Sequence, residues 1–361
     1  MQTQPDGHEV VRSFADATSL QLAPLLVLDH LTDYLDRKGL GRGGLAWQRI
    51  GDGQSNITYR IARGQDSFVL RRGPRPPHPP STHDMVREAR TQRVLRAQGV
   101  AAPEILDICE DTSVLGVPFY VMSWLDGVVL TQSAPDALNT PEERCRTSVE
   151  LVRALANLHA VDVSRGPASK LGRPTGYLER QIDRFSQLWE LNATRDLPGI
   201  SEVATWLTSN RPESQTVSVV HGDYRLGNIM FKSSAPAGVL AILDWELATL
   251  GDPLADLGYL TATYTDPGSP PIPLNLSPVT AQPGYLRSED LIRVYQDHSD
   301  LDLSGLVWYQ TLALWKAAIF CEAIHARWIN GERPGDTTFG PSLAAGVPAL
   351  LHAAQTYQRR L

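Results

Sequence analysis

Cysteine is scarce in this chain of 361 residues. The three that occur, Cys109, Cys145 and Cys321, are widely separated and form neither a Cys-x-x-Cys pair nor a zinc-binding spacing, which is typical of small buried thiols in a reducing compartment. The first residues lack the basic and apolar segments of a signal peptide, and the longest apolar stretches, such as Leu20–Leu28, are too short to cross a bilayer. We therefore expect a cytoplasmic protein with no membrane partner.

An excess of positive charge is also missing. The chain has 33 Lys and Arg against 40 Asp and Glu, a formal net charge of −7, which argues against a nucleic-acid-binding protein because such proteins present a basic face. Internal repeats and low-complexity tails are absent from the sequence. The hydrophobic content of 42% is ordinary for a soluble globular protein, and the length allows one large core or two lobes.

The most informative stretch runs from residue 217 to residue 260. Its apolar, β-branched start, Val217–Val220, predicts a buried strand, and Asp223 follows shortly after it. A second predicted strand begins at Asn228, and a third, Val239–Leu243, ends directly on Asp244. Two aspartates and one asparagine at strand ends suit a site that holds a divalent cation and positions a hydroxyl, because Mg²⁺ prefers hard oxygen ligands.

The interval between these residues is that of a kinase catalytic loop. In kinases an Asp accepts the proton of the substrate hydroxyl, and an Asn five residues later holds metal, as Asp223 and Asn228 are spaced here. Arg225 occupies the place of a phosphate-contacting Lys, and Asp244 that of a second metal ligand. Aspartates also favour turns and caps, but their order and spacing after apolar strands favour a functional site.

The segments HGDYRLGNIMF, residues 221–231, and ILDWELATLGDPLADLGYL, residues 242–260, closely resemble the aminoglycoside phosphotransferase and choline kinase-like family. The predicted helix 176–189 is more similar to the kinase-like domains associated with acyl-CoA dehydrogenases. The resemblance implies an α+β, bilobal, protein-kinase-like fold. Residues 1–125 would form a nucleotide-binding lobe with a small antiparallel sheet and one main helix, and residues 126–361 a larger, mainly helical lobe for catalysis and acceptor binding.

A predicted hairpin in the first lobe has a small polar turn. Its strands are Trp47–Ile50 and Ile57–Ile61, and glycines in the turn between them would let backbone N–H groups approach phosphate oxygens. Any hairpin can turn on Gly and Asn, so the turn alone does not establish a phosphate site. The family resemblance implies that the nucleotide phosphates are covered by Gly53, Gln54, Ser55 and Asn56.

The strand Phe68–Arg71 resembles the kinase strand that carries a phosphate-binding Lys, with Arg71 at that position and Arg72 beside it. Strand alternation places the two arginines on opposite faces. We favour Arg71 for the site and expect Arg72 to contribute little. The predicted helix Asp84–Gln98 places Glu88 where the family supplies a partner for the basic strand residue, although an acidic residue near a helix N-terminus is also favoured by the helix dipole.

Two further assignments follow from the resemblance, and a third follows from the length of a loop. The strand Pro118–Met122 enters a segment similar to the hinge that recognises adenine, so Met122, Ser123 and Trp124 are predicted nucleotide contacts. Asp256 matches an aspartate that braces the catalytic loop through hydrogen bonds. The loop 265–283 is a candidate frame for the acceptor site.

Two predicted helices carry polar residues whose roles the sequence leaves open. His159, on the helix 148–161, is interpreted as a core histidine rather than a ligand. Glu322 and Arg327, on the helix 307–329, are further candidates for the acceptor pocket, although core packing is the favoured interpretation of that helix.

The resulting hypothesis is a phosphotransferase that uses ATP or GTP and Mg²⁺. Asn228 and Asp244 would hold the metal, Arg71 would orient phosphates, and Asp223 with Arg225 would act on a small-molecule alcohol. A hydroxyacyl-CoA or related metabolite is the favoured acceptor, with an aminoglycoside as the alternative and a catalytically weak pseudokinase as a further one. A metal-dependent hydrolase and a non-enzymatic interaction protein fit less well. The protein would be a monomer or homodimer.

Overall fold

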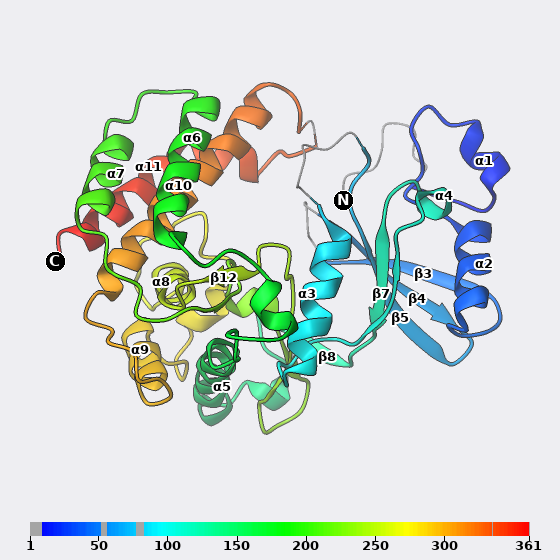
Figure 1. Ribbon diagram of the computed structural model, residues 1–361, viewed down its shortest axis with the longest axis horizontal. Helices are drawn as coiled ribbons and strands as arrows, with labels where there is room; N and C mark the ends of the chain where they lie inside the picture. The colour runs from blue at the N-terminus through cyan, green and yellow to red at the C-terminus, as the bar shows by residue number, and fades with distance from the viewer. Residues whose placement is uncertain (1–8, 52–55, 77–82, 334, 361) are drawn as a thin grey trace. The chain divides into compact units, whose positions relative to one another are not determined.

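The computed structural model describes residues 9–51, 56–76, 83–333 and 335–360 (Figure 1). The chain divides into two compact units, Met1–Asp126 and Gly127–Leu361, which we call the N-terminal and C-terminal units. Within the described residues, every helix is too short or too polar to cross a membrane.

A five-stranded antiparallel sheet forms the centre of the N-terminal unit, in the order β3-β4-β5-β7-β6. Strands β3, β4 and β5 are neighbours both along the chain and in the sheet, as expected for a meander. The strands are β3 (Leu45–Ile50), β4 (Ile57–Arg63), β5 (Asp66–Arg72), β6 (Ile105–Cys109) and β7 (Phe119–Ser123).

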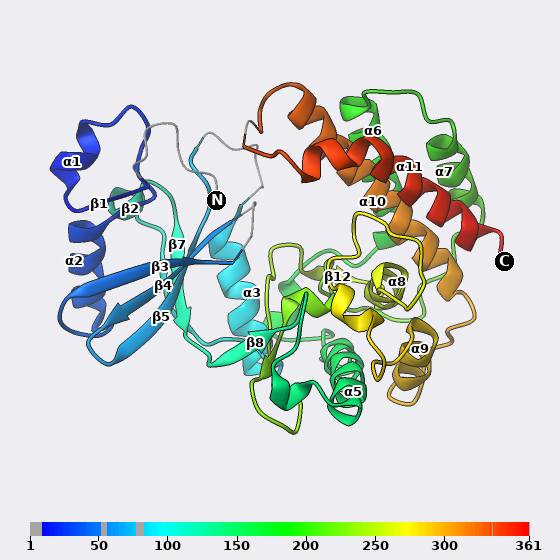
Figure 2. The same ribbon diagram turned by 180° about the vertical axis from the view of Figure 1, so that it is seen from behind.

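Two helices cover opposite faces of this sheet, α2 (Leu28–Lys38) and α3 (Met85–Ala97) (Figures 1 and 2). Leu70 of β5 packs in one core with residues of α2, whereas its neighbour Val69 packs in a second core with residues of α3. Because side chains alternate along a strand, each residue of β5 belongs to one of these two faces. Smaller elements complete the unit: β1 (Val10–Val11), α1 (Phe14–Thr18), β2 (Leu26–Val27) and α4 (Thr112–Leu115).

Two small antiparallel sheets organise the C-terminal unit. One has the order β11-β10-β8, with β8 (Gly127–Val129), β10 (Ile229–Lys232) and β11 (Val239–Ile242). The other pairs β9 (Ser218–Val220) with β12 (Thr249–Gly251). The connection from β9 to β10 carries Asp223 and Asn228, and the connection from β11 to β12 carries Asp244. The two connections are joined by a hydrogen bond of 2.8 Å from Leu243 N to Asn228 O.

The longest helix, α10 (Leu306–Ile329), is apolar around most of its circumference and is therefore mostly buried. It packs against α6, α8 and α11, and α11 runs beside it in both views (Figures 1 and 2). Its indoles find polar partners on α7, where Trp315 Nε1 donates to Ile200 O at 3.0 Å. The surrounding helices are α5 (Pro141–His159), α6 (Tyr177–Asn192), α7 (Gly199–Ser209), α8 (Leu254–Thr263), α9 (Ser288–Gln296) and α11 (Phe339–Gln358).

The predicted elements are confirmed within a few residues, with one clear error. Helix α5 begins at Pro141 rather than at residue 148, because Thr140 caps its first turn by accepting a hydrogen bond from Glu143 N. Strands β6, β8 and β12 and helices α7, α9 and α11 were not predicted. The predicted loop 265–283 is irregular apart from one 3₁₀ turn, Pro278–Ala281.

Candidate active site

A glycine makes the turn that leads from β9 to Asp223. Gly222 has φ = +87°, a conformation that other residues rarely adopt. A Cβ atom added to it would lie 2.9 Å from the Cβ of Leu247. The backbone therefore requires glycine at this point, and the turn delivers Asp223 shortly after the buried strand β9.

His221 connects the two loops of the site. Its Nδ1 accepts a hydrogen bond from Asp223 N at 3.2 Å, and its Nε2 contacts Leu243 O at 2.9 Å. Because a backbone amide can only donate and a carbonyl can only accept, the proton of the neutral ring is on Nε2. The ring is fully buried with both nitrogens occupied. His221 is thus unavailable as a metal ligand, which argues against the hydrolase hypothesis.

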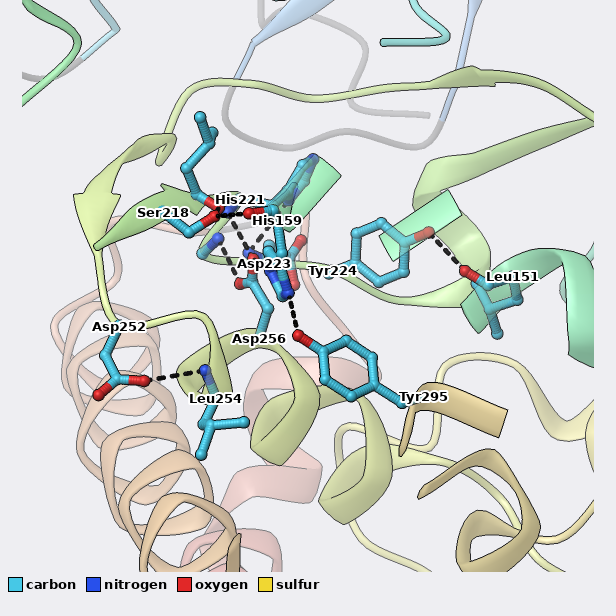
Figure 3. A network of polar contacts seen from close by, with 12 residues as sticks. Leu151, His159, Ser218, His221, Asp223, Tyr224, Asp252, Leu254, Asp256 and Tyr295 are labelled. Carbon is cyan, nitrogen blue, oxygen red and sulfur yellow. Dashed lines mark hydrogen bonds and ion pairs between the residues drawn. The ribbon is translucent and has the colours of Figure 1, made fainter. Parts of the chain in front are cut away.

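Asp256 holds the backbone of the loop (Figure 3). Its Oδ2 accepts from His221 N at 2.6 Å and its Oδ1 from Gly222 N at 2.8 Å. His159 Nε2 lies 3.3 Å from Oδ2, and His159 Nδ1 lies 2.7 Å from the hydroxyl of Tyr295. Burial acts to raise the pKa of Asp256, but the hydrogen bonds from His159 and from the backbone of His221 outweigh it and hold that pKa below its usual value. The predicted bracing role of Asp256 and the core position of His159 are both confirmed.

Asp223 is held at both carboxylate oxygens. Tyr259 donates from its hydroxyl to Oδ1 at 2.6 Å, while Asn228 Nδ2 donates to Oδ2 at 2.8 Å and Arg225 Nε lies 3.3 Å from Oδ2. The side chain of Asp223 is nevertheless 27% exposed. Burial and the charge of Asp223 raise the pKa of Tyr259 well above its ordinary value, so the phenol stays a donor. The carboxylate is therefore fixed in orientation and still accessible.

Tyr259 is the residue of this site that the sequence interpretation missed. It lies three positions after Asp256 on α8, so both side chains project from the same side of that helix. The DLGYL segment that contains it was recognised for Asp256 alone.

Asn228 and Asp244 have features that suit the predicted metal site. Asn228 Nδ2 donates to both O and Oδ2 of Asp223 at 2.8 Å, which turns its Oδ1 away from these partners. Asp244 has φ = +64°, an uncommon conformation for a residue other than glycine and one that recurs at functional sites. The next residue, Trp245, is fully buried and donates to Ile242 O at 3.0 Å. An amide oxygen and a carboxylate are donors that Mg²⁺ accepts.

Across the described part of the chain, no group of three or more His, Cys, Asp or Glu side chains forms a ready-made metal centre. Mg²⁺ commonly has one or two protein carboxylates and completes its coordination with water and phosphate. The donor set of Asn228 and Asp244 therefore fits Mg²⁺ better than it fits Zn²⁺, which takes three or four His or Cys ligands.

The predicted pair of Arg71 and Glu88 is present in the N-terminal unit. Arg71 Nε lies 3.0 Å from Glu88 Oε1, and Glu88 also accepts from the hydroxyl of Tyr120 at 3.0 Å. Glu88 is 1% exposed and Arg71 14%. Arg71 shares the α3 face of the sheet with Val69, as strand alternation predicts. Their contact with a nucleotide stays a prediction.

Arg72, the neighbour of Arg71, has a structural role in the N-terminal unit. It lies on the α2 face and is 1% exposed, where its guanidinium donates to the carbonyl oxygens of Gly73 at 2.9 Å, Leu115 at 3.3 Å and Leu25. Burial lowers the pKa of Arg72 to about 10. Arg72 therefore connects β5 to two other segments of the unit, and its small expected contribution to activity stays a prediction.

The remaining predicted nucleotide contacts stay predictions, and the structure shows only where some of these residues lie. Gly53, Gln54 and Ser55 lie outside the described residues. Asn56 is buried, and its Oδ1 lies 2.9 Å from His83 Nδ1. At the end of β7, Met122 pairs with Val69 in the sheet. Ser123 forms hydrogen bonds with the backbone of Glu104 through its own backbone and through its hydroxyl. The ring of Trp124 lies 4.4 Å from the guanidinium carbon of Arg60.

A small pocket lies beside Arg225 in the C-terminal unit. Part of its lining comes from the loop 265–283, namely Thr265, Leu274, Leu276, Ser277 and Thr280. Glu322 is not part of it, because its buried carboxylate accepts from Thr194 and pairs with Arg195 at 2.7 Å. Arg327 pairs with Glu332 at 3.3 Å. These two candidates on α10 are therefore structural, and the candidate acceptor side is the loop next to Arg225.

The fold is kinase-like, and its loops carry the residues of a candidate phosphotransferase site. Residues 46–276 match the family described as "Phosphotransferase enzyme family", and the chain belongs to this family. It is 31% identical over 290 residues to acyl-CoA dehydrogenase family member 11 of Rattus norvegicus, which covers 80% of this chain. The chain spans only 37% of the length of that relative.

Solved structures agree with this assignment. A protein of Ralstonia eutropha assigned as an aminoglycoside phosphotransferase is 26% identical, with a TM-score of 0.73 and coverage of 91% of this chain and 98% of that one. A thermostable mutant of another aminoglycoside phosphotransferase, in a ternary complex with ADP and hygromycin B, is 14% identical, with a TM-score of 0.56 and coverage of 89% and 97%. The predicted α+β, protein-kinase-like fold is thus confirmed.

Proposed function

We propose that this protein is an ATP-dependent small-molecule kinase that transfers the γ-phosphoryl group to a substrate hydroxyl, with Asp223 as the base. The observation that carries the proposal is the state of the Asp223 carboxylate, which is oriented by Tyr259 and Asn228 yet remains accessible. A base held in this way can accept the proton of an alcohol as that alcohol attacks the phosphorus. Most of the rate enhancement would come from positioning and from neutralising charge.

Asn228 and Asp244 would hold Mg²⁺, which when bound neutralises the phosphate oxygens of the nucleotide. Arg225, beside the base, would contact the transferred phosphoryl group. In the N-terminal unit, Arg71 would orient the nucleotide phosphates while Glu88 fixes its guanidinium. The adenine would contact the backbone of 122–124, and GTP is the alternative nucleotide.

The proposed acceptor is a hydroxyacyl-CoA or a related hydroxylated metabolite. Its support is the similarity of most of this chain to part of a protein named for acyl-CoA chemistry. The alternative acceptor, an aminoglycoside, is a polycation and requires an acidic pocket, whereas the pocket beside Asp223 includes Arg225. The pseudokinase alternative is motivated by Arg71 in place of Lys, and the intact pair with Glu88 argues against it.

The test is turnover of ATP and GTP with Mg²⁺ in the presence of hydroxyacyl-CoAs, aminoglycosides, choline and macrolides, with Asp223→Asn as the control. We expect a hydroxyacyl-CoA to be phosphorylated, and we expect Asp223→Asn to lower the rate by a factor on the order of 10²–10⁴ without weakening nucleotide binding. Nucleotide binding with no turnover of any acceptor would favour the pseudokinase. Near-normal turnover by Asp223→Asn would show that another residue is the base.

A further inference from the structure

Lysine is rare among the basic residues of this protein, and one lysine is unlike the others. Only four of the 33 Lys and Arg are lysines. Lys38, Lys170 and Lys232 are exposed, whereas Lys316 is partly buried on α10. Lys316 lies at the contact of α10 with α6.

Neutral groups surround the ammonium of Lys316. Its Nζ donates to Gln181 Oε1 at 2.7 Å and lies 4.8 Å from the centre of the Phe185 ring, both on α6. In the part of the chain that the structure describes, no carboxylate comes within 4.0 Å of this nitrogen. Burial and the charge of Arg184 lower the pKa of Lys316 to about 8, while Asp256 acts in the opposite direction.

The carboxylates on neighbouring elements are engaged elsewhere or face away. On α10, Glu322 pairs with Arg195. On α8, Asp256 accepts backbone N–H groups of the catalytic loop. On α6, Glu179 pairs with Arg211 at 3.6 Å, and Asp183 lies about 200° around the helix from Gln181, at about 100° per residue.

A partly buried ammonium without a counter-charge is unfavourable, because an amide oxygen and an aromatic face compensate it less well than an anion does. Arg184, on α6 three residues after Gln181, adds a second positive charge that acts on Lys316, and it is exposed. Two cations that repel each other are poorly explained by fold stability alone. They are well explained by a ligand that brings the missing negative charge.

Helix α10, which carries Lys316, packs against α8, the helix that carries Asp256. Asp256 influences Lys316 electrostatically, and the same carboxylate holds the backbone of His221 and Gly222, the two residues before Asp223. An apolar side chain is close by, because Phe320 follows one helical turn after Lys316 and is 54% exposed. The surroundings thus combine positive charge with an apolar surface.

We propose that Lys316 and Arg184 bind an anionic group of the acceptor substrate, a phosphate or carboxylate attached to an apolar chain. The inference rests on the proposed kinase function, and it identifies residues that would read the acceptor. A polycationic acceptor would be repelled at this place, whereas the phosphates of an acyl-CoA would be attracted. Gln181 acts as a positioning residue that holds the Lys316 ammonium.

The test is competitive labelling of lysines with trace acetic anhydride over a series of pH values, read by mass spectrometry. The protein carries its own references, because Lys38, Lys170 and Lys232 are labelled in the same sample. We expect Lys316 to titrate near pH 8, below the ordinary lysine pKa of about 10.4. Coenzyme A should raise the pKa of Lys316 and slow its labelling, while kanamycin should change neither.

Two controls distinguish binding of a negatively charged group from steric protection of Lys316 by any bound ligand. Pantetheine, which lacks the phosphates, should leave the labelling of Lys316 unchanged; protection by pantetheine equal to that by coenzyme A would overturn the anion site. Lys316→Met should weaken coenzyme A binding by about 10- to 100-fold with nucleotide binding retained, and Lys316→Arg should restore much of it. Lys232→Met is the matched surface control and should bind normally.

The two proposals fail in different ways. If a hydroxyacyl-CoA is phosphorylated but coenzyme A never protects Lys316, the anion site is wrong and the kinase assignment stands. If coenzyme A protects Lys316 but no acceptor of the panel is phosphorylated, the anion site is supported and the kinase assignment is wrong.

Discussion

The hydroxyl of Tyr259 donates a hydrogen bond of 2.6 Å to Oδ1 of Asp223, 36 residues away in sequence. Tyr259 and Asp256 both project from α8, one to the side chain of Asp223 and the other to the backbone just before it. A single helix therefore positions both the side chain of the proposed base and the backbone that precedes it. Removing one contact should leave the other intact, which makes the two separable by mutation.

Tyr259→Phe should lower kcat while leaving the Kd for nucleotide unchanged. A hydrogen bond to a charged group contributes roughly 1.5–3 kcal/mol, so we expect a loss of about 10- to 100-fold. Tyr309→Phe is the matched control, because that hydroxyl also donates to a carboxylate, Asp252 Oδ2 at 2.8 Å, rather than to Asp223. The measurement is steady-state kinetics together with nucleotide titration. Equal kcat for wild type and Tyr259→Phe would show that this hydrogen bond does not orient the base.

Asp256→Asn should destabilise the protein in a pH-dependent way. The pKa of Asp256 is lowered in the folded state, so its stabilising contribution is present above the unfolded value of about 3.9 and is lost as the pH falls through the folded value. The gap in urea midpoint between wild type and Asp256→Asn should therefore be largest near neutral pH and shrink below about pH 4. Asp183→Asn, an exposed change on α6, should show no gap. A difference in urea midpoint that does not change with pH would contradict the lowered pKa of Asp256 in the folded protein.

Asp244→Ala and Asn228→Ala should both weaken Mg²⁺-dependent nucleotide binding. The effect of Asp244→Ala should be larger, because it removes a formal charge from the ligand set. Asn228→Ala should in addition lower kcat, since its amide holds Oδ2 of Asp223. Nucleotide titrations with and without Mg²⁺ measure the first effect, with the exposed change Asp300→Ala as control. Unchanged metal dependence in both variants would place the metal elsewhere.

The spacing of Asp223, Asn228 and Asp244 could be predicted because it is local, and strand alternation likewise predicted the face of Arg71. These features depend on order along the chain and on the period of a strand. Tyr259 could not be assigned in this way, since its meaning depends on a contact between α8 and a loop 36 residues earlier. A tyrosine on a helix is ordinarily a core residue.

The burial of Arg72 and Glu322 could not be predicted from the sequence. Both are charged, and charged residues are seldom fully buried unless they are paired. Arg72 is buried because three backbone carbonyls converge on it, and Glu322 because Thr194 and Arg195 do. Loop carbonyls and distant partners leave no pattern in the sequence, so these partners could not be predicted from it.

The adjacent arginines of β5 allow one more prediction, because the same substitution should have opposite consequences at the two positions. Arg71→Lys keeps a positive charge beside Glu88 but loses the planar fork that can bond a carboxylate and a phosphate together. We expect kcat/KM for ATP to fall about tenfold, the effect of roughly 1.4 kcal/mol, with the thermal midpoint nearly unchanged.

Arg72→Lys should instead lower the thermal midpoint and leave kcat/KM for ATP of the folded protein close to normal. A lysine cannot satisfy the carbonyl oxygens of Leu25, Gly73 and Leu115 together, and a buried acceptor without its partner costs about 1–3 kcal/mol. Kinetics at a temperature where both variants are folded, combined with thermal unfolding, separates the two effects. If Arg72→Lys lost the kinetic activity and Arg71→Lys the stability, then Arg72 would be the phosphate-binding residue of this strand and the face assigned to the nucleotide would be wrong.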